Sequence, residues 1–365
     1  MLEQNHGLLR EAVGHAVLRP LSTPKLRNDY VLIRTEAIAL NPTDWTTLDA
    51  KGDDGTIVGC DFAGVVEEVG DAVTKPFAKG DRFTGFAHGG NDEYHEDGAF
   101  ARYITAKGDM LMRIPDGAGF ESAATVAVGI GTLGYGLYHI LGLSLPDGSA
   151  PSSSEPVLIY GGSTATGTLA VQFAKLQVNP TTLSGRKVLT TCSAKHFGLM
   201  KERGADLVYD YRDPNIGKQI HKDTDDELTT VFDTVGVDSS AAICADAFGS
   251  QGGMYCSLLP VEVARKDVKS IFFLGYDLKG ESYIFEGDIY PAKPEMLEWS
   301  KKFTTLAEKL WVEGKWVPHP VSVKGGGLLG AVEGMQRMRE GTGPSGEKWV
   351  YRVEETEWLE SSAEK

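Results

Sequence analysis

A glycine-containing turn separates an apolar segment from an amphipathic one in residues 157–175. The pattern predicts a strand that ends at glycines and resumes as a helix. Gly161 and Gly162 would let the backbone approach a phosphate, and Gly167 would let the helix pack close to the strand. Small and hydroxyl-bearing residues at the helix start would surround the anion: Ser163, Thr164, Ala165 and Thr166. We therefore predict a pyrophosphate site, although the spacing departs from G-x-G-x-x-G and a turn that only packs stays an alternative.

The second predicted strand, residues 187–192, ends where a dinucleotide-binding protein selects its cofactor. NAD-specific proteins place an acidic residue there to hold the ribose 2′-hydroxyl. This chain instead carries Ser193, Ala194, Lys195 and His196. A 2′-phosphate would accept a hydrogen bond from Ser193 and pair with Lys195 and His196, so we predict NADPH rather than NADH. The alternative is that Lys195 and His196 are solvated residues of a first helical turn.

The elements that must position these residues alternate between strand and helix, which is typical of a doubly wound parallel sheet. The pattern predicts further strands at 207–209, 229–235 and 253–258, with helices at 197–203 and 239–248. Residues 1–125 differ, because short alternating segments predict a barrel-like β domain with strands at 30–39, 64–69, 80–84 and 99–104. A helix is predicted from Phe120 through about Leu143, and after residue 280 a helix at 294–313 and strands at 317–323 and 348–353.

Composition limits the classes of protein to consider. The 365 residues exceed the usual size of one domain and predict two. The net charge of −15 and the absence of Lys/Arg-rich runs make nucleic acid and anionic membranes poor partners. Four scattered cysteines without C-x-x-C pairs argue against disulfides and structural zinc. No apolar run reaches about 18 residues and no signal-peptide pattern is present, so we expect no membrane insertion and a cytoplasmic location.

Several motifs resemble those of the medium-chain dehydrogenase/reductase superfamily in order and spacing: LNPTDW at 40–45, GCDFAG at 59–64, GDR at 80–82 and GAFA at 98–101. Others are similar to the fungal trans-acting enoyl reductases of polyketide biosynthesis, of the lovastatin type: YGGSTAT at 160–166, TCS at 191–193, RGAD at 203–206, YDYR at 209–212 and GEK at 346–348. The resemblance implies an α/β fold with a doubly wound Rossmann cofactor domain and a GroES-like β-barrel catalytic domain. We expect the catalytic domain at 1–125 and 281–365 and the NADPH-binding domain at 126–280.

The resemblance also implies roles for residues. It places four residues beside the nicotinamide, namely Thr43, Asp44, Trp45 and Thr46. It places Ser163 to Thr166 at the pyrophosphate, Ser193 to His196 at the 2′-phosphate and Tyr211 near the adenine. The nicotinamide pocket would be completed by Leu258, Leu259, Val350 and Tyr351. The acyl channel would be lined by Val128, Gly129, Ile130, Gly131, Thr132, Leu133, Gly134 and Tyr135, with a further wall from Leu274, Gly275 and Tyr276. Close packing of a helix or of a core strand would explain these last two segments equally well.

The sequence offers few residues that could bind a metal or act as a general acid or base. Zinc-dependent members carry Cys where this chain has Asn41, and Gly-His-Glu where it has Gly59, Cys60 and Asp61, so we expect no metal. His88, His95 and Cys60 could still form an accidental metal site, but we expect the two histidines, which belong to an acidic loop, to face solvent. Candidate catalytic residues are Asp44, Thr46 and Tyr135, although Asp44 could serve only to orient a loop. Relatives often carry Lys where this chain has Thr46, and the sequence identifies no firm proton donor.

Three functions follow from these observations. The first is an NADPH-dependent enoyl reductase acting in trans on a thioester held by the acyl carrier domain of a reducing polyketide synthase or a polyketide synthase–peptide synthetase hybrid. The second is a free-standing quinone or enone oxidoreductase. The third is a non-redox binding protein or cyclase that retains the nucleotide fold. By resemblance to the lovastatin-type enzyme we expect a monomer.

Overall fold

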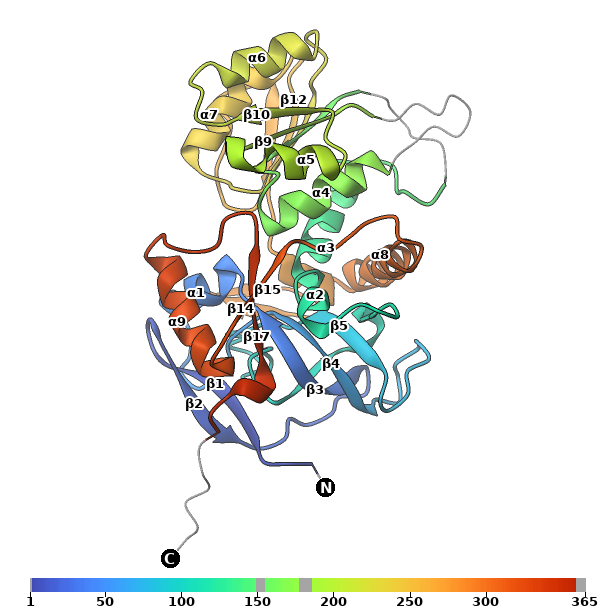
Figure 1. Cartoon of the computed structure of the whole chain (residues 1–365), viewed down its shortest axis with the longest axis vertical. Coiled ribbons are helices and arrows are strands. Elements are labelled where there is room, and N and C mark those ends of the chain that lie inside the picture. Colours follow the sequence, from blue (N-terminus) through green and yellow to red (C-terminus); the bar gives the residue numbers. More distant parts are fainter. Residues whose placement is uncertain (1, 149–154, 177–185, 359–365) are drawn as a thin grey trace, which may run out of the picture. The chain divides into compact units, whose positions relative to one another are not determined.

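The computed structural model describes residues 2–148, 155–176 and 186–358, which form two compact units. The first unit consists of residues 1–128, 276–312 and 318–365, and we call it the catalytic unit after the domain expected there from the sequence. The second consists of residues 129–275 and 313–317, and for the same reason we call it the cofactor unit. Each unit is described by itself below, and Figure 1 gives the labels of their elements.

The cofactor unit is built on six parallel strands in the order β10-β9-β8-β11-β12-β13. Numbered from the first strand of the unit, the order is 3-2-1-4-5-6, so the direction of winding reverses between β8 and β11 as in a Rossmann sheet. The predicted doubly wound parallel sheet is therefore confirmed. Its strands are β8 (Val157–Tyr160), β9 (Val188–Cys192), β10 (Leu207–Asp210), β11 (Thr230–Asp233), β12 (Gly253–Ser257) and β13 (Val268–Phe272).

Helices follow the strands because parallel neighbours need crossover connections. β8 is a run of four apolar or aromatic residues buried on both faces, as parallel strands are. A core cluster joins the strands to α6 and α7 on one face of the sheet, and α4 packs on β8 and β9. The helices are α4 (Ala165–Lys175), η3 (Ala194–His196), α5 (Phe197–Glu202), α6 (Ile216–Asp223) and α7 (Asp238–Ala247).

The catalytic unit contains a largely antiparallel sheet in the order β16-β17-β3-β4-β5-β7, in which β6 also pairs with β3. Two hairpins, β1–β2 and β14–β15, lie outside this sheet. The strands are β1 (Asn5–Ala12), β2 (His15–Leu21), β3 (Tyr30–Ala39), β4 (Asp61–Val69), β5 (Arg82–Phe86), β6 (Tyr103–Lys107), β7 (Met112–Arg113), β14 (Tyr283–Phe285), β15 (Asp288–Tyr290), β16 (Val321–Lys324) and β17 (Lys348–Arg352).

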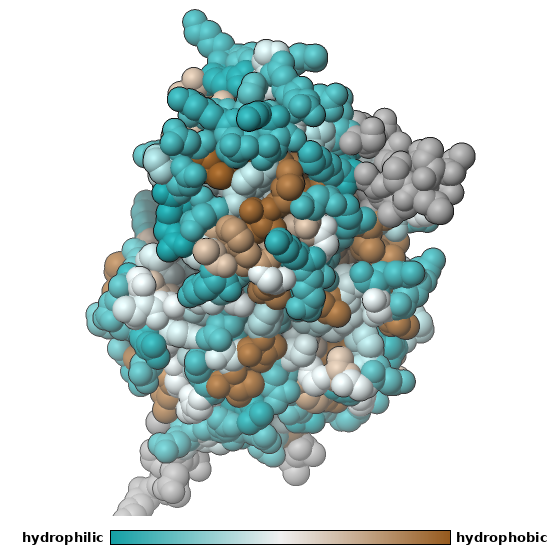
Figure 2. Space-filling model, turned by 45° about the horizontal axis from the view of Figure 1, so that its top comes forward, coloured by the Kyte–Doolittle hydropathy of each residue, from teal (hydrophilic) through white to brown (hydrophobic). Residues whose placement is uncertain are grey.

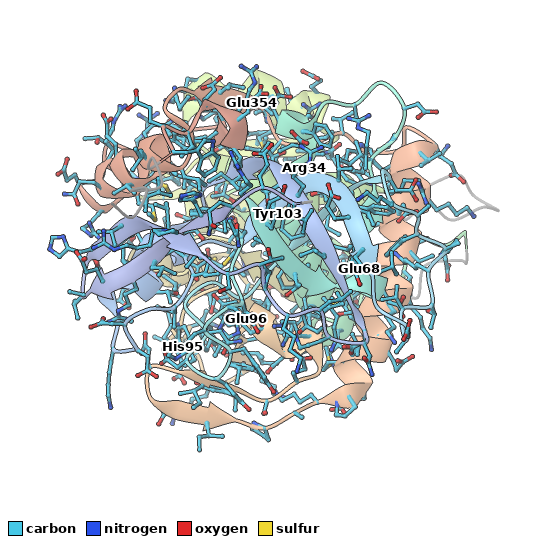
Figure 3. The ribbon with its side chains drawn as sticks, turned by 90° about the horizontal axis from the view of Figure 1, so that it is seen from below. Arg34, Glu68, His95, Glu96, Tyr103 and Glu354 are labelled. Carbon is cyan, nitrogen blue, oxygen red and sulfur yellow. The ribbon has the colours of Figure 1, made fainter. Side chains whose placement is uncertain are left out.

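Amphipathic helices cover the core of the catalytic unit. In α8, the buried residues recur at helical spacing, from Met296 through Ser300 and Phe303 to Ala307 and Trp311. Charged residues lie at the surface, as Glu68, His95, Glu96 and Glu354 do in Figure 3, and most of the face shown in Figure 2 is hydrophilic. The helices are α1 (Pro42–Asp49), η1 (Gly108–Met110), α2 (Phe120–Ala123), η4 (Gly275–Lys279, with its first residue in the cofactor unit), α8 (Pro294–Val312), α9 (Gly327–Arg339) and η5 (Val353–Glu355).

The helix predicted from Phe120 to about Leu143 is divided in the structure. α2 ends at Ala123, α3 spans Ala127–Leu133, and a π-helical segment, η2, spans Gly134–Ile140. By length and composition Phe120–Ile140 could cross a membrane, but 78% of its apolar window is buried inside the structure, as in a core helix of a water-soluble protein. The strand predicted at 99–104 is displaced, since β6 begins at Tyr103.

Candidate functional site

The turn after β8 is a close-packed backbone cradle in which side chains do not fit. Gly161 has a φ of 81°, which an L side chain rarely adopts. A Cβ at Gly161 would lie 2.6 Å from Val235 Cγ2, and one at Gly162 would lie 2.1 Å from Thr190 Oγ1. A Cβ at Gly167 would lie 2.3 Å from the Gly161 carbonyl oxygen. The three glycines are thus needed for close packing of this turn, and its approach to a pyrophosphate stays a prediction.

The start of α4 follows directly from this cradle. Thr164 is the N-cap, and its Oγ1 accepts a hydrogen bond of 2.9 Å from the Gly167 N–H. The same hydroxyl lies 2.9 Å from Thr234 Oγ1, so it is already engaged in holding the turn. Ser163, Ala165 and Thr166 are half-buried at the helix start, where helix N–H groups favour an anion.

The predicted 2′-phosphate residues lie together after β9. Ser193 is the N-cap of the short helix η3, which contains Ala194, Lys195 and His196. Ala194 and Lys195 are exposed, and Ser193 and His196 are half-buried. Burial, together with the nearby charge of Lys195, lowers the pKa of His196, so its imidazole is neutral at neutral pH. Lys195 is therefore the charged group of this segment.

A charged pair that the sequence analysis missed lies at the end of the neighbouring strand. Arg212 donates hydrogen bonds of 2.9 and 2.6 Å to the carboxylate of Asp210. These bonds lower the pKa of Asp210, and the backbone N–H of Ala194 contributes to the same effect. An acidic residue thus lies beside the predicted 2′-phosphate segment, and Arg212 balances its charge. The pairing of β10 with β9, which no local pattern specifies, brings them together.

Exposed apolar side chains gather at the carboxyl ends of the parallel strands. Tyr211, Val237, Leu259 and Phe272 follow or end β10, β11, β12 and β13, and all four are exposed. Leu258, beside them, is half-buried. Ligands of doubly wound sheets bind outside these strand ends, so the structure brings the predicted Tyr211, Leu258 and Leu259 to the appropriate edge.

In the catalytic unit, α1 presents the residues predicted beside the nicotinamide. Asp44 is buried, and its Oδ2 accepts a 2.7 Å hydrogen bond from the Asn41 N–H at the helix start. Burial raises the pKa of Asp44 to about 7, against the opposing effect of that hydrogen bond. Thr43 and Trp45 are half-buried, whereas Thr46 is exposed. Asp44 therefore combines a structural role at the helix start with a pKa suited to proton exchange near neutral pH.

A buried lysine binds the side chains of Asn41 and Asp61, two positions at which this chain differs from the zinc-dependent pattern. Lys348 forms an ion pair with Asp61, and its Nζ donates a 2.8 Å hydrogen bond to Asn41 Oδ1. Asn41 Nδ2 donates to Asp61 Oδ2 at 2.9 Å, and the Val128 N–H donates to Asp61 Oδ1 at 2.8 Å. The Asn41 and Asp61 oxygens are thus used by an ammonium group. Among the described residues, no three His, Cys, Asp or Glu side chains form a group that could hold a metal ion.

Tyr276 lies in a buried cluster behind α1. Its hydroxyl is 3.2 Å from Thr43 Oγ1 and 3.8 Å from Cys60 Sγ. The ring of His88 stacks on it with centroids 3.5 Å apart. His88 is 1% exposed, so the expectation that it faces solvent is wrong, while His95 is exposed and its Nε2 lies 3.2 Å from Asp53. Desolvation lowers the pKa of His88, which keeps its ring neutral.

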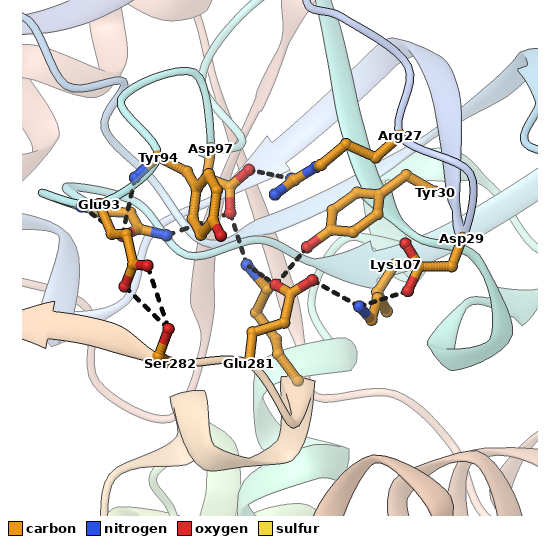
Figure 4. A network of polar contacts seen from close by, with 11 residues as sticks. Arg27, Asp29, Tyr30, Glu93, Tyr94, Asp97, Lys107, Glu281 and Ser282 are labelled. Carbon is orange, nitrogen blue, oxygen red and sulfur yellow. Dashed lines mark hydrogen bonds and ion pairs between the residues drawn. The ribbon is translucent and has the colours of Figure 1, made fainter. Parts of the chain in front are cut away.

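An ion network holds the segment that carries Tyr276 (Figure 4). Asp97 pairs with Arg27 and, at 2.6 Å, with Lys279. Lys107 pairs at 2.6 Å with Glu281, which also lies 3.5 Å from Lys279. Asp97, Lys107 and Lys279 are buried, so each charge requires its partners. The network joins the loop at 88–97 to the segment at 276–281.

The predicted substrate segment is divided between the two units. Val128 belongs to the catalytic unit, and residues 129–135 belong to the cofactor unit. A Cβ at Gly129 would lie 2.8 Å from Leu169 Cδ1, which supports the close-packing alternative at that position. Tyr135 is buried, with its ring 4.6 Å from that of Phe273. The remaining members of these two segments, all buried or half-buried, are Ile130, Gly131, Thr132, Leu133, Gly134, Leu274 and Gly275.

Val350 and Tyr351 are buried in the catalytic unit. Val350 pairs with Ala39 of β3, and a Cβ at Gly334 of α9 would lie 2.2 Å from the Tyr351 hydroxyl. Their side chains fill the core, so their approach to a nicotinamide stays a prediction. Sequence reasoning also missed Lys348, whose only local signal is its place in the GEK segment.

Comparisons with known proteins agree with this geometry. The family model of the alcohol dehydrogenase GroES-like domain matches residues 27–116. Trans-enoyl reductase TOXD of Cochliobolus carbonum is 48% identical over 280 residues, covering 77% of this chain and 92% of the relative. Trans-enoyl reductase ACTTS2 of Alternaria alternata is 42% identical over 349 residues, covering 95% and 98%. The structure of CurK enoyl reductase has a TM-score of 0.72 at 18% identity and covers 96% of this chain and 99% of that one, which establishes the fold.

Proposed function

We propose that this chain, which belongs to the trans-enoyl reductases of the medium-chain dehydrogenase/reductase superfamily, uses NADPH to reduce an α,β-unsaturated acyl thioester. The substrate would be carried by the acyl carrier domain of a reducing polyketide synthase or a polyketide synthase–peptide synthetase hybrid. The observation that carries the proposal is similarity over almost the whole chain to relatives of that name. The glycine cradle after β8 supports the part of this proposal that concerns a nicotinamide dinucleotide.

The choice of NADPH rests on the residues after β9. Lys195 is exposed and charged, and Ser193 is half-buried at the start of η3. Asp210, an acidic residue that interacts with the backbone of Ala194, is engaged by Arg212. A phosphate would therefore meet a hydroxyl and a lysine without an uncompensated carboxylate.

Conjugate reduction asks little of side chains, because bound NADPH supplies a hydride to the β-carbon of the substrate. The protein must orient the thioester, stabilise the enolate oxygen and deliver a proton to the α-carbon. The half-buried Thr43 and the buried Asp44 are candidates for the last task. Lys348 is engaged by Asn41 and Asp61, so it supports the start of α1 and is not assigned to the substrate.

The other expected properties belong to the same proposal. The apolar segment Phe120–Ile140 is mostly buried, which supports a water-soluble enzyme, and a location in the cytoplasm is part of the same proposal. The net charge of −15 disfavours binding to nucleic acid or to an anionic membrane. A monomer that meets its synthase transiently would suffice, because a complete enoyl reduction needs one cofactor site and one substrate site.

The test is NADPH oxidation with an α,β-unsaturated acyl thioester, run beside NADH and a small quinone. We expect turnover with NADPH and the thioester and little with the other pairs. Faster turnover of the quinone would favour a free-standing quinone oxidoreductase. Cofactor binding without oxidation in any combination would instead indicate a non-redox role such as a cyclase.

A further inference from the structure

The hydroxyls of Thr43 and Tyr276 form a short relay from the half-buried start of α1 into the protein. Thr43 Oγ1 lies 3.2 Å from the Tyr276 hydroxyl and 3.3 Å from Thr47 Oγ1. Thr43 is half-buried, whereas Tyr276 is buried behind it. A substrate could therefore touch Thr43 but not Tyr276.

The environment of the Tyr276 phenol connects it to an acid. Its oxygen lies 3.8 Å from Cys60 Sγ, and the Cys60 thiol is close enough to Asp44 to influence the pKa of that carboxyl group. Asp44 lines a small pocket, together with Arg10, Thr47 and other residues. The stacked ring of His88 shields the phenol on one face. Burial keeps the phenol of Tyr276 protonated by raising its pKa, so it holds a proton to give.

We propose that Tyr276, acting through the hydroxyl of Thr43, supplies the proton that completes the reduction. The inference rests on the proposed enoyl reduction and names the source of its proton. When a hydride reaches the β-carbon, the electron pair of the carbon–carbon double bond moves to the enolate. The Thr43 hydroxyl gives its proton to the α-carbon as the Tyr276 phenol gives its own to the Thr43 oxygen. A proton from the Asp44 carboxyl group, passed by the Cys60 thiol, restores the phenol.

Asp44 then recovers its proton from water, so one proton is consumed for each hydride transferred. Thr43 is the catalytic residue in this scheme, because it alone touches the reacting carbon. Tyr276, Cys60 and Asp44 act through it.

The test compares Tyr276→Phe and Thr43→Val with the wild type in NADPH oxidation, using the crotonyl thioester of N-acetylcysteamine as the probe. Tyr276→Phe keeps the ring that stacks on His88 and removes only the hydroxyl. We expect kcat to fall roughly 10- to 100-fold in each variant, which is within the usual contribution of a positioned proton donor. The Kd for NADPH should not change in Tyr276→Phe, because the hydroxyl that is removed belongs to a buried side chain. The solvent deuterium isotope effect on kcat should rise, and the isotope effect of 4-deuterated NADPH should fall, because protonation becomes limiting.

Tyr283→Phe is the matched control. Tyr283 belongs to the same aromatic cluster, but its hydroxyl donates to Asp277 Oδ1 at 3.0 Å. Its kcat should stay within about twofold of the wild type. Thermal unfolding of the unliganded proteins tests the relay without turnover. If the two hydroxyls are bonded to each other, the double variant Thr43→Val with Tyr276→Phe loses less than the sum of the single losses.

The proposal is wrong if Tyr276→Phe keeps its kcat, or loses it with both isotope effects unchanged. Strictly additive losses of unfolding temperature would also contradict it, because the hydroxyls would then not be coupled. Failure of the wild type to oxidise NADPH with any enoyl thioester would instead overturn the proposed function. A folded Tyr283→Phe protein with wild-type activity separates an effect of the relay from general damage to the cluster.

Discussion

Replacing Lys348 by Met should destabilise the catalytic unit by leaving the carboxylate of Asp61 buried without its cation. Asp61 is 0% exposed and Lys348 is 2% exposed. Asp61 would keep hydrogen bonds from Asn41 Nδ2 and the Val128 N–H, at 2.9 and 2.8 Å, but no charge would balance it. Removing one partner of a buried ion pair costs about 3–5 kcal/mol. For a unit of this size the loss corresponds to roughly 10 °C in the unfolding midpoint.

The double variant Asp61→Asn with Lys348→Met distinguishes an unpaired charge from a lost shape. Asn at position 61 still accepts from the Val128 N–H and leaves no net charge in the core. We therefore expect the double variant to recover most of the lost stability, because an intact buried pair adds little over neutral groups that pack well. Unfolding followed by circular dichroism and by the fluorescence of the tryptophans provides the measurement.

Two results would refute this reasoning. A Lys348→Met protein that unfolds within about 1 kcal/mol of the wild type, less than an unpaired buried charge costs, would show that water or a rearranged partner compensates for Asp61. A double variant as unstable as the single one would show that the lysine is needed for packing or for its hydrogen bond to Asn41.

Three further changes test other parts of the two units. Asp44→Asn should flatten the pH dependence of the unfolding temperature. The pKa of Asp44 in the folded protein, about 7, lies above the ordinary value of an aspartate, about 4, so wild-type stability should fall as pH rises between these values, by up to about 4 kcal/mol. Parallel curves for the two proteins would contradict the assignment. Lys195→Glu should weaken NADPH binding about tenfold or more, because one charge-assisted contact is worth over 1 kcal/mol. The effect on NADH binding should be much smaller. Equal losses of affinity for NADPH and NADH would show that Lys195 does not bind the 2′-phosphate. Gly161→Ala should abolish NADPH binding measured by fluorescence, because its Cβ would lie 2.6 Å from Val235 Cγ2. Gly198→Ala is its control, since no atom lies within 4 Å of the added Cβ, and it should bind NADPH normally.

Local sequence patterns were sufficient to predict many of the strands and helices of the cofactor unit. The strands of a parallel sheet are buried on both faces, so β8 is visible as an uninterrupted apolar run. The turn that follows needs glycine for reasons of backbone geometry, as the φ of Gly161 confirms. The alternation of such strands with helices then leaves few topologies, and the observed Rossmann order is one of them.

Other elements could not be predicted from the sequence, because their residues have weak local preferences for helix or strand. α9 begins at Gly327 and contains further glycines, which are poor helix formers. Its stability comes from packing, since Gly330 and Gly334 let the ring of Tyr351 lie against the helix. The break between α2 and α3 was equally invisible, because the apolar periodicity continues through it.

The sequence by itself determined which residue types were available for chemistry: the glycines of the cradle, a lysine where an acid would select NAD, and Asn41 and Asp61 in place of zinc-dependent residues. Only the tertiary structure decided their partners. Lys348 lies 287 residues from Asp61, and Tyr276 lies 233 residues from Thr43. Hydrogen bonds and ion pairs act over a few ångströms between atoms that the fold brings together. Their identity therefore depends on strand order and packing, which no spacing along the chain records.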